Sequence, residues 1–296
     1  MGVVCVVWGT TYLAIRIGLE TIPPGLLGGL RYTAAGLMLA AALRLRGDRL
    51  PWHEWRAHAL AGGLTIFAGN GGVIWAEQWV PSGIAAVMVA TVPFWMLGVE
   101  MCFPDGERPS SRVLTGLLVG FAGIVVLVWP DITGASGASH GYIVGIIALQ
   151  VACVGWSLGS VLSRRFAGRG GALASAAMQM FFGGLFMLLA GSLRGEWARL
   201  AWSTRTVVAE LYLTFVGSIV GYSAYTIALG RLPSATVSLY AYANPVIAVL
   251  LGALLLAEPL GARVLGATAM VLCGSAIVQS RRTRTRAAAT VPGDTP

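Results

Sequence analysis

The second half of this chain repeats its first half, and this duplication constrains the fold more than any other feature of the sequence. Trp8 and Arg16 recur as Trp156 and Arg164, 148 positions later. Further pairs follow in the same order: Leu45-Arg46-Gly47 with Leu193-Arg194-Gly195, Pro81-Ser82 with Pro233-Ser234, Pro93 with Pro245, and Gly123 with Gly274. A repeat of this length is too long for a solenoid unit, so it indicates two equivalent halves of a bundle.

The composition predicts that this bundle lies in lipid. Of the 296 residues, 56% are hydrophobic and 11% are charged, with a mean hydropathy of +0.76. That is more apolar surface than one water-soluble core can bury, and several uncharged stretches reach about 20 residues, enough to cross a bilayer as a helix. We expect an all-α integral membrane fold with ten transmembrane helices near residues 2–19, 25–44, 57–76, 83–103, 112–129, 141–163, 171–193, 206–229, 234–256 and 263–280.

The placement of arginine predicts how the chain is oriented. The net charge is +8 and there is no lysine. With an inside N-terminus, the inner loops carry fourteen arginines and the outer loops four, as expected when positive charge gathers on the cytoplasmic side. We therefore expect a multi-pass protein of the bacterial cytoplasmic (inner) membrane with both termini in the cytoplasm. Nucleic-acid binding is disfavoured, because no soluble segment is long enough to form a binding domain.

An odd number of helices in each half predicts how the halves are related. The two copies then enter the membrane from opposite sides, and such inverted repeats are typical of secondary transporters. The expected organisation is a first five-helix repeat over 1–130, an outer linker over 131–140 and a second five-helix repeat over 141–280. A basic cytoplasmic tail over 281–296 is expected to be disordered.

Two prolines lie inside predicted spans at matching places of the two halves, Pro93 in the fourth span and Pro245 in the ninth. Proline lacks an amide proton and clashes with the preceding turn, so each is expected to kink its helix. Interrupted helices of inverted repeats often meet near the substrate site, so we interpret the pair as helix breaks for gating. The alternative is that the kinks only help the bundle to pack.

Trp8 and Trp156 lie near the starts of the first and sixth spans. Tryptophan at such a place often anchors a helix at the lipid headgroups. The other interpretation is that Trp8 with Thr11, and Trp156 with Ser160, face a central cavity. There they would offer an aromatic plane and a hydroxyl to a cationic or amphipathic substrate.

Further polar side chains share helical faces. Asn244 follows Tyr240 by four residues, Tyr222 and Tyr225 lie together in the eighth span, and Asn70 lies among three glycines. All of them also fit helix-to-helix hydrogen bonding and close packing. The predicted substrate-binding residues are Trp8, Thr11, Tyr12, Asn70, Trp156, Ser160, Tyr222, Tyr225, Tyr240 and Asn244.

Charged side chains at membrane depth are costly and need a reason. The candidates for ion pairing or proton coupling are Arg31 in the second span, Glu77 at the end of the third and Glu100 towards the end of the fourth. Pairing of an arginine such as Arg16 with Glu77 would neutralise both charges. Glu100 is expected to reach the inner interface or to pair with an arginine there.

Sequence motifs for catalysis and cofactor binding are missing. No histidine, cysteine or carboxylate cluster has the spacing of metal ligands, and a phosphate-binding loop that ends in Gly-Lys is impossible without lysine. We expect no catalytic residue, no metal, no cofactor and no enzymatic activity. Transport would be driven by an ion or substrate gradient, or by a partner.

Several segments resemble the EamA family of the drug/metabolite transporter superfamily. They are Trp8-Gly9-Thr10-Thr11-Tyr12, Gly29-Leu30-Arg31-Tyr32, Ala76-Glu77-Gln78 before Pro81-Ser82-Gly83, and Tyr242-Ala243-Asn244-Pro245 followed by Glu258. The resemblance covers nearly the whole chain apart from the polar tail. It implies two inverted five-helix repeats, alternating access around a central cavity, and export of small metabolites, amino acids or amphipathic drugs. It also matches Glu107 to Glu258, which we interpret as helix-start residues.

We therefore expect a secondary transporter that exports small molecules through the bilayer, with proton or substrate-gradient coupling. Because the duplication already supplies two halves, the chain is expected to act as a monomer or as a homodimer. One alternative is a membrane-embedded enzyme on a lipid-linked substrate, which would need a nucleophile or an acid–base pair at one depth. The other is a non-transporting membrane subunit, which would need a soluble partner-binding domain. The sequence shows neither feature.

Overall fold

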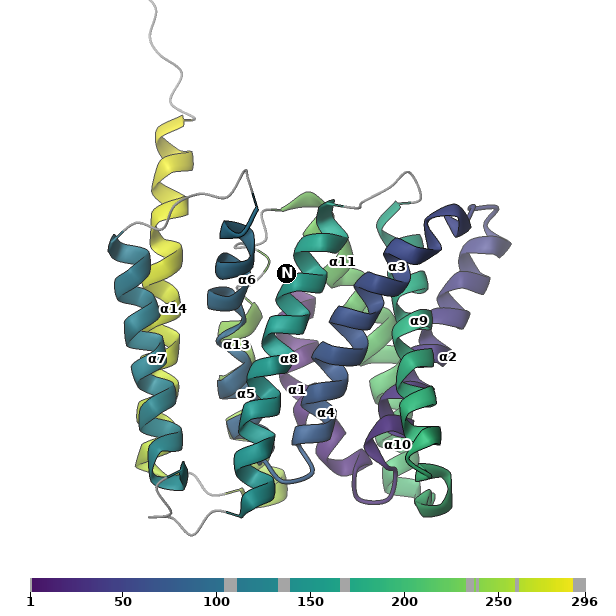
Figure 1. The fold of residues 1–296 in the computed structure, drawn as a ribbon, viewed down its shortest axis with the longest axis horizontal. Coiled ribbons are helices and arrows are strands. Elements are labelled where there is room, and N and C mark those ends of the chain that lie inside the picture. Colours follow the sequence, from purple (N-terminus) through teal and green to yellow (C-terminus); the bar gives the residue numbers. More distant parts are fainter. Residues whose placement is uncertain are drawn as a thin grey trace, which may run out of the picture.

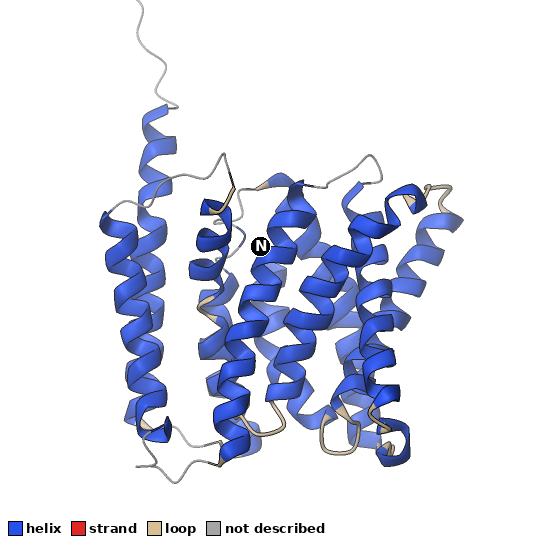
Figure 2. Cartoon of the chain, viewed as in Figure 1, coloured by secondary structure: helices blue, strands red, loops and turns tan. Residues whose placement is uncertain are grey.

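The computed structural model describes residues 2–103, 111–132, 139–165, 171–232, 237, 240–258 and 261–289. All regular secondary structure in these ranges is helical (Figure 1, Figure 2). Residues 133–138 of the predicted linker, and Glu107, lie outside the described part of the chain.

The first half forms five helical stretches that match the five predicted spans in order. The first two are α1 (Gly2–Gly18) and α2 (Pro24–Leu45). The third is built from η1 (Trp52–Glu54), α3 (Trp55–Gly62), η2 (Gly63–Asn70) and α4 (Gly71–Ala76). The fourth consists of α5 (Ser82–Val89) and α6 (Val92–Met101), and the fifth is α7 (Ser111–Ile132).

The second half follows the same plan. It begins with α8 (His140–Arg165) and α9 (Gly171–Leu193), followed by the short η3 (Glu196–Arg199). Its third stretch is built from α10 (Thr204–Tyr212), η4 (Leu213–Tyr222) and α11 (Ser223–Arg231). The last helices are α13 (Tyr240–Leu256) and α14 (Ala262–Ala289).

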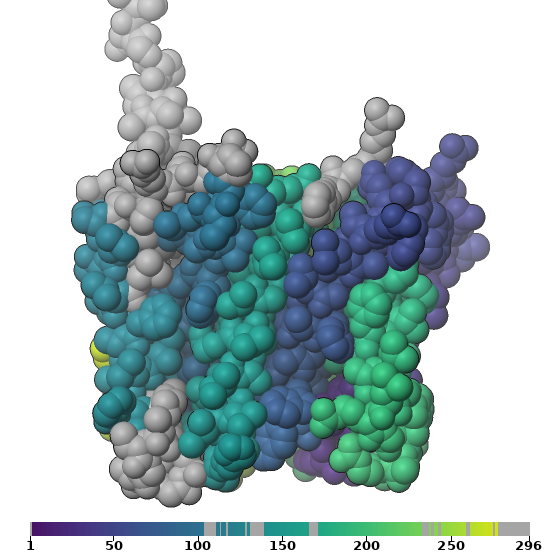
Figure 3. Space-filling model, in the orientation of Figure 1, coloured from purple at the N-terminus to yellow at the C-terminus, as the bar shows by residue number. Residues whose placement is uncertain are grey.

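Six of these helical stretches are long and apolar enough to cross a membrane: Pro24–Leu45, Trp52–Ala76, Ser82–Met101, His140–Arg165, Gly171–Leu193 and Thr204–Arg231. Four shorter apolar helices accompany them, at Gly2–Gly18, Leu114–Leu127, Asn244–Leu256 and Ala262–Gly274. Figure 3 shows a broad face on which α7, α8 and α9 lie at the surface, and these helices expose Leu118, Val151 and Leu189. Exposed apolar side chains of this kind belong in lipid, so the chain is a multi-pass membrane protein.

The two predicted helix breaks behave differently. The fourth span is interrupted between Val89 and Val92, and Pro93 lies in the first turn of α6, where its missing amide proton costs no helical hydrogen bond. Pro245, in contrast, lies within the continuous helix α13. The interruption is therefore confirmed at Pro93, whereas at Pro245 the helix runs through.

The last helix is longer than predicted. α14 continues to Ala289, so residues 281–289, which were expected to be disordered, are helical. Arginine and alanine have high helix propensity, and once a helix is nucleated by its apolar part such residues can extend it into water.

A π-helical segment lies at the same place in both halves. η2 spans Gly63–Asn70 in the third helical stretch, and η4 spans Leu213–Tyr222 in the eighth. Their last residues are 152 positions apart, the same separation as Pro81 and Pro233. Such wide turns loosen the hydrogen-bond ladder of a helix and are frequent at functional sites.

Equivalent helices of the two halves pack against each other. α2 lies against α9 at one edge of the molecule and α7 against α14 at the other (Figure 1). A Cβ atom on Gly36 would lie 2.5 Å from the backbone nitrogen of Phe181, and one on Gly184 would lie 2.4 Å from that of Thr33. Gly36 and Gly184 are 148 positions apart, so the same close crossing is built twice.

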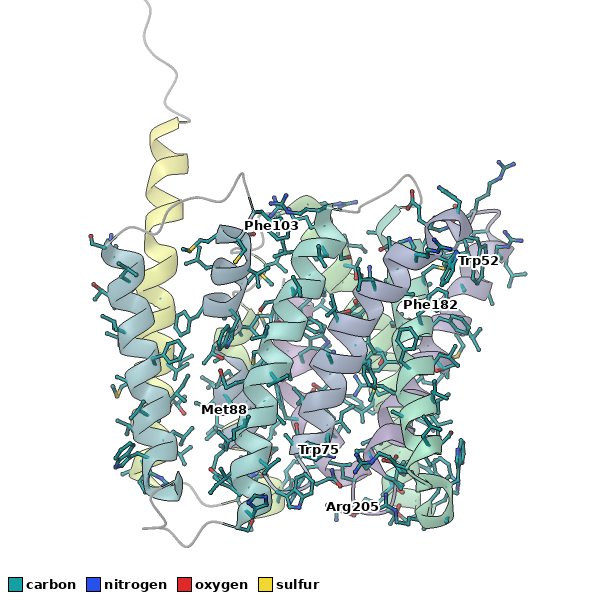
Figure 4. The ribbon with its side chains drawn as sticks, viewed as in Figure 1. Trp52, Trp75, Met88, Phe103, Phe182 and Arg205 are labelled. Atoms are coloured by element: carbon teal, nitrogen blue, oxygen red, sulfur yellow. The ribbon has the colours of Figure 1, made fainter. Side chains whose placement is uncertain are left out.

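The third and eighth helical stretches begin at opposite ends of the molecule. Figure 4 labels Trp52, at the start of the third stretch, near one end, and Arg205, at the start of the eighth, near the other. Between these ends, α1 packs against α13 and η4, while α8 packs against α6 and η2. This arrangement brings Trp8 of α1 and Trp156 of α8 to the centre of the bundle.

Candidate functional site

A cluster of four aromatic side chains occupies the middle of the bundle. The ring centroids of Trp8 and Trp156 are 5.3 Å apart, in an edge-to-face arrangement. Tyr240 stands edge-on to Trp8 at 4.9 Å, and Tyr225 contacts both tryptophans at 5.1 and 5.0 Å. Edge-to-face contacts of this kind are favourable because the positive edge of one ring meets the negative face of the next.

A narrow cavity of about 50 Å³ opens beside this cluster. Seven of the ten predicted substrate-binding residues line it, together with Arg31: Trp8, Thr11, Tyr12, Asn70, Trp156, Tyr240 and Asn244. The volume suffices for a few water molecules and not for a metabolite. The site as described is therefore too small for a metabolite, and side chains or helices must separate before a larger molecule enters.

The other three predicted residues form a layer behind the cavity. Ser160 donates to the Trp156 carbonyl at 2.7 Å, and its hydroxyl lies 2.7 Å from that of Tyr225. The Tyr222 hydroxyl lies 3.0 Å from that of Thr65 and donates to the side-chain oxygen of Gln179 at 2.7 Å. Tyr225 belongs to the aromatic cluster, Ser160 bonds to it, and none of the three residues lines the cavity.

The π segment η4 holds two side chains that reach the cavity from other helices. The Trp8 indole nitrogen donates to the Gly217 carbonyl at 3.2 Å, and the Arg31 Nε donates to the Ser218 hydroxyl at 3.0 Å. A Cβ atom on Gly221 would lie 2.6 Å from the same indole nitrogen. The wide turn and its glycine therefore fix where the Trp8 ring lies.

Arg31 is 2% exposed, and its guanidinium is only partly satisfied. Nε bonds Ser218, Nη2 donates to the Tyr32 hydroxyl at 2.9 Å, and Cζ lies 4.3 Å from the centre of the Tyr32 ring. Nη1 is buried without a hydrogen-bond partner in the described structure. The residue thus carries a positive charge with unused donors beside the cavity.

Two asparagines line the cavity. The Asn244 amide lies 3.2 Å from the Cys5 carbonyl oxygen and 3.1 Å from the Tyr240 carbonyl oxygen, so its nitrogen faces them. The Asn70 amide makes only a long contact of 3.4 Å, to the Thr65 carbonyl within η2. Both amides keep hydrogen-bonding capacity towards the cavity.

The arginine pairing expected for Glu77 is not present in the described structure. Arg16 donates to the backbone carbonyl of Glu77, while both carboxylate oxygens of Glu77 are buried without a partner. Arg16, at the end of α1, thus reaches the main chain of Glu77 and forms no hydrogen bond with its carboxylate. Arg31, although buried nearby, bonds Ser218 and Tyr32 instead.

Two other glutamates singled out in the sequence have clear partners. Glu100 pairs with Arg164 across 3.8 Å, which is one of the two outcomes expected for it. Glu258 caps the first turn of α5, accepting from the Ser82 nitrogen at 2.8 Å, the Ser82 hydroxyl at 2.9 Å and the Gly83 nitrogen at 3.0 Å. The interpretation of Glu258 as a start residue of its own span is thus corrected, because its carboxylate caps a helix of the other half.

A larger cavity of about 550 Å³ lies at the end where α3 begins. Its lining includes Glu54, the buried His58, Ser163 and Ser175. Gln179 donates to Ser163 at 2.8 Å and to Ser175 at 2.7 Å while it accepts from Tyr222. One amide therefore joins the wall of this cavity to the layer behind the central one. The sequence analysis missed Gln179, although an isolated glutamine in an apolar span was a signal.

Among the described residues, no group of three histidine, cysteine or acidic side chains could hold a metal ion. What the centre of the bundle offers is an aromatic wall, amide and hydroxyl groups, and one arginine. These groups suit binding of an amphipathic molecule, and the apolar exterior places that binding inside a membrane.

Comparison with known proteins agrees with this description. The model of the EamA-like transporter family matches the chain in two stretches, residues 1–129 and 143–280. The chain is 38% identical to the "Uncharacterized inner membrane transporter YedA" of Escherichia coli K12 over 83% of this chain and 78% of that protein. It is 27% identical to the "Probable amino-acid metabolite efflux pump" of the same organism, over 89% of this chain and 88% of that one. A solved crystal structure superposes with a TM-score of 0.70 at 26% identity and covers 96% of both chains.

The fold and the site define a membrane transporter for small molecules and not an enzyme. This chain belongs to the EamA-like transporter family, as the resemblance of its sequence motifs indicated.

Proposed function

We propose that this protein is a secondary exporter that carries small amphipathic metabolites across the inner membrane, with the substrate bound against Trp8 and Trp156 in the central cavity. The observation that carries the proposal is that two equivalent tryptophans meet 5.3 Å apart beside the central cavity. The efflux named for one relative favours export as the direction, and the inner membrane named for another favours the location.

The proposed architecture has ten transmembrane helices in two inverted five-helix repeats, over 1–130 and 141–280, with both termini cytoplasmic. Three observations support it. The family model matches twice, six long and four shorter apolar helices are present, and Trp52 and Arg205 begin equivalent stretches at opposite ends. The arginine-rich loops then face the cytoplasm.

Alternating access follows from this symmetry. The 550 Å³ cavity lies at the proposed cytoplasmic end and provides a vestibule, while the central cavity is too small for a metabolite. At the other end the first turn of α5 is held by Glu258 of the second half. We propose that the substrate enters through the vestibule. The cytoplasmic end then closes and the end near Glu258 opens, which releases the substrate outside. The π segments and the break before Pro93 are where helices can bend at low cost.

The driving force is proposed to be a proton or substrate gradient. Glu77 is the better candidate for proton coupling because its carboxylate is buried without a partner, whereas Glu100 pairs with Arg164. A single chain contains both halves of the cavity, so we propose that the monomer is competent to transport, with a homodimer as the alternative.

The test is uptake and efflux of labelled amino acids, amines and cationic dyes in proteoliposomes, with and without an imposed pH gradient. Trp156→Ala is expected to abolish movement of any compound that wild type carries, because it removes half of the aromatic wall. Trp202→Phe serves as the control, since Trp202 is 55% exposed and does not line the cavity. If no compound moves with wild type, or if Trp156→Ala transports normally, the proposed site is wrong.

A further inference from the structure

Arg31 points to the chemical class of the substrate. Its guanidinium lies in the wall of the central cavity and is 2% exposed, yet Nη1 has no hydrogen-bond partner in the described structure. A buried cation with unused donors is costly in a membrane protein unless an anion meets it during the working cycle.

The surroundings of Arg31 hold buried carboxylates but no direct ion pair. Glu77 and Glu210 are buried close enough to interact with its charge, yet among the described residues no carboxylate forms an ion pair with Arg31 within 4.0 Å. Its other nitrogens are fixed by Ser218 and Tyr32, and the Tyr32 ring lies under the guanidinium at 4.3 Å. The side chain is therefore held in one orientation before any ligand arrives, so little rotamer entropy is lost on binding.

The other residues of the cavity wall limit the chemistry of the rest of the ligand. Trp8, Trp156 and Tyr240 present apolar rings, while Thr11 and Asn70 add small polar groups. One arginine nitrogen in an aromatic wall fits a monoanion with an apolar body. A phosphate dianion would need more donors than this wall supplies.

We infer that the transported molecule carries a carboxylate, which Arg31 Nη1 binds while the apolar part of the molecule packs against Trp8 and Trp156. This rests on the proposed function, because it places the ligand in the same cavity. Arg31 acts as a specificity-determining residue. It binds ionised carboxylates and discriminates against the corresponding amides and against cationic amines.

The first experiment uses wild-type protein in detergent micelles and calorimetric titration at neutral pH with matched ligands. The probes are 3-phenylpropionate, phenylalanine, their amides 3-phenylpropionamide and phenylalaninamide, and phenethylamine. The two carboxylates should bind about 10- to 100-fold more tightly than their amides, because a charge-assisted hydrogen bond is lost in the amide. Phenethylamine should bind no better than the amides. Equal binding of acid and amide, or no binding of either acid, overturns the inference.

The second experiment assigns the effect to Arg31. Arg31→Gln should reduce the affinity for 3-phenylpropionate to that of its amide and leave the amide unchanged, while Arg31→Lys should recover part of the difference. Arg194→Gln, in an exposed position, should behave as wild type. If Arg31→Gln weakens acid and amide equally, the residue is structural and the inference fails. If that variant does not fold, the acid–amide comparison on wild type decides alone.

The two proposals fail in distinguishable ways. If panel compounds move in proteoliposomes and Trp156→Ala stops them, while acids and amides bind alike, the cavity is right and the carboxylate inference is wrong. If nothing moves with wild type, the proposed function fails together with this inference.

Discussion

Trp8 and Trp156 occupy the same position in the two halves of the chain, and their rings meet edge to face at the centre of the bundle, 5.3 Å apart. A pseudo-symmetric pair in direct contact lies where the two halves meet. When the two halves move relative to each other, this contact must change. A substrate that binds at the pair can therefore favour one conformation over another.

The Trp8 ring depends on a glycine in the π segment η4. Gly221→Ala would place a Cβ atom 2.6 Å from the indole nitrogen of Trp8, and a rigid ring can only move away. We expect the bond to the Gly217 carbonyl to break and the transport rate to fall at least about tenfold, the factor that corresponds to 1.4 kcal/mol. Transport in proteoliposomes measures this. Gly230→Ala, which meets nothing within 4 Å, should transport normally; equal activity of both variants would show that the ring position is unimportant.

The close crossing of α2 and α9 should tolerate no side chain larger than hydrogen at Gly36 or Gly184. Gly36→Ala and Gly184→Ala each push a Cβ atom to 2.5 Å or less from a backbone nitrogen of the facing helix. Each should destabilise the protein by about 1–3 kcal/mol through overpacking. Thermal unfolding in detergent is the measurement, with Gly98→Ala as the helical control because its site is open. A control that loses as much stability as the crossing variants would contradict the account.

Glu258 should stabilise the contact between the halves at the start of α5. Glu258→Gln keeps the shape but loses the charge that accepts bonds from Ser82 and Gly83 at the helix N-terminus. We expect a loss of about 1–2 kcal/mol in the free energy of unfolding. Ser82→Ala removes only the hydroxyl donor and should cost less. Unchanged thermal unfolding of Glu258→Gln would show that the cap contributes nothing.

Gln179 should matter for stability more than its isolated position in the sequence suggests. Gln179→Leu removes one hydrogen-bond partner each from Tyr222, Ser163 and Ser175 in one step. Each lost hydrogen bond costs about 0.5–1.5 kcal/mol. The unfolding midpoint should therefore fall clearly below that of Ser175→Ala, which removes one of these bonds. Similar midpoints for the two variants would refute a shared network.

Much of the fold could be predicted from the sequence because duplication and apolar length are visible there. The helical class, the order of the spans and the break before Pro93 followed from apolar runs and proline chemistry. That Trp8 and Trp156 face a central cavity was one of two interpretations, and both residues line that cavity. Their contact with each other was not predicted.

What could not be predicted depends on tertiary contacts. The π segments each carry two glycines in an apolar helical run, as packing seams also do, so the wide turns are not visible in the sequence. The burial of His58, which is 5% exposed, arises because the helices around the vestibule cover it. The partner of Glu258 lies 176 positions away, a contact that no local pattern reveals.

Cys153 allows the most direct test of alternating access around the central cavity, since it is a buried native thiol in the cavity wall. Cys5, Cys102 and Cys273 are replaced by serine, and a membrane-impermeant thiol reagent is applied from each side of oriented vesicles in turn. The account predicts labelling of Cys153 from both sides, slowed from both by a transported compound. Labelling from one side only, or labelling that a transported compound does not slow, would contradict a substrate site that opens alternately to the two sides.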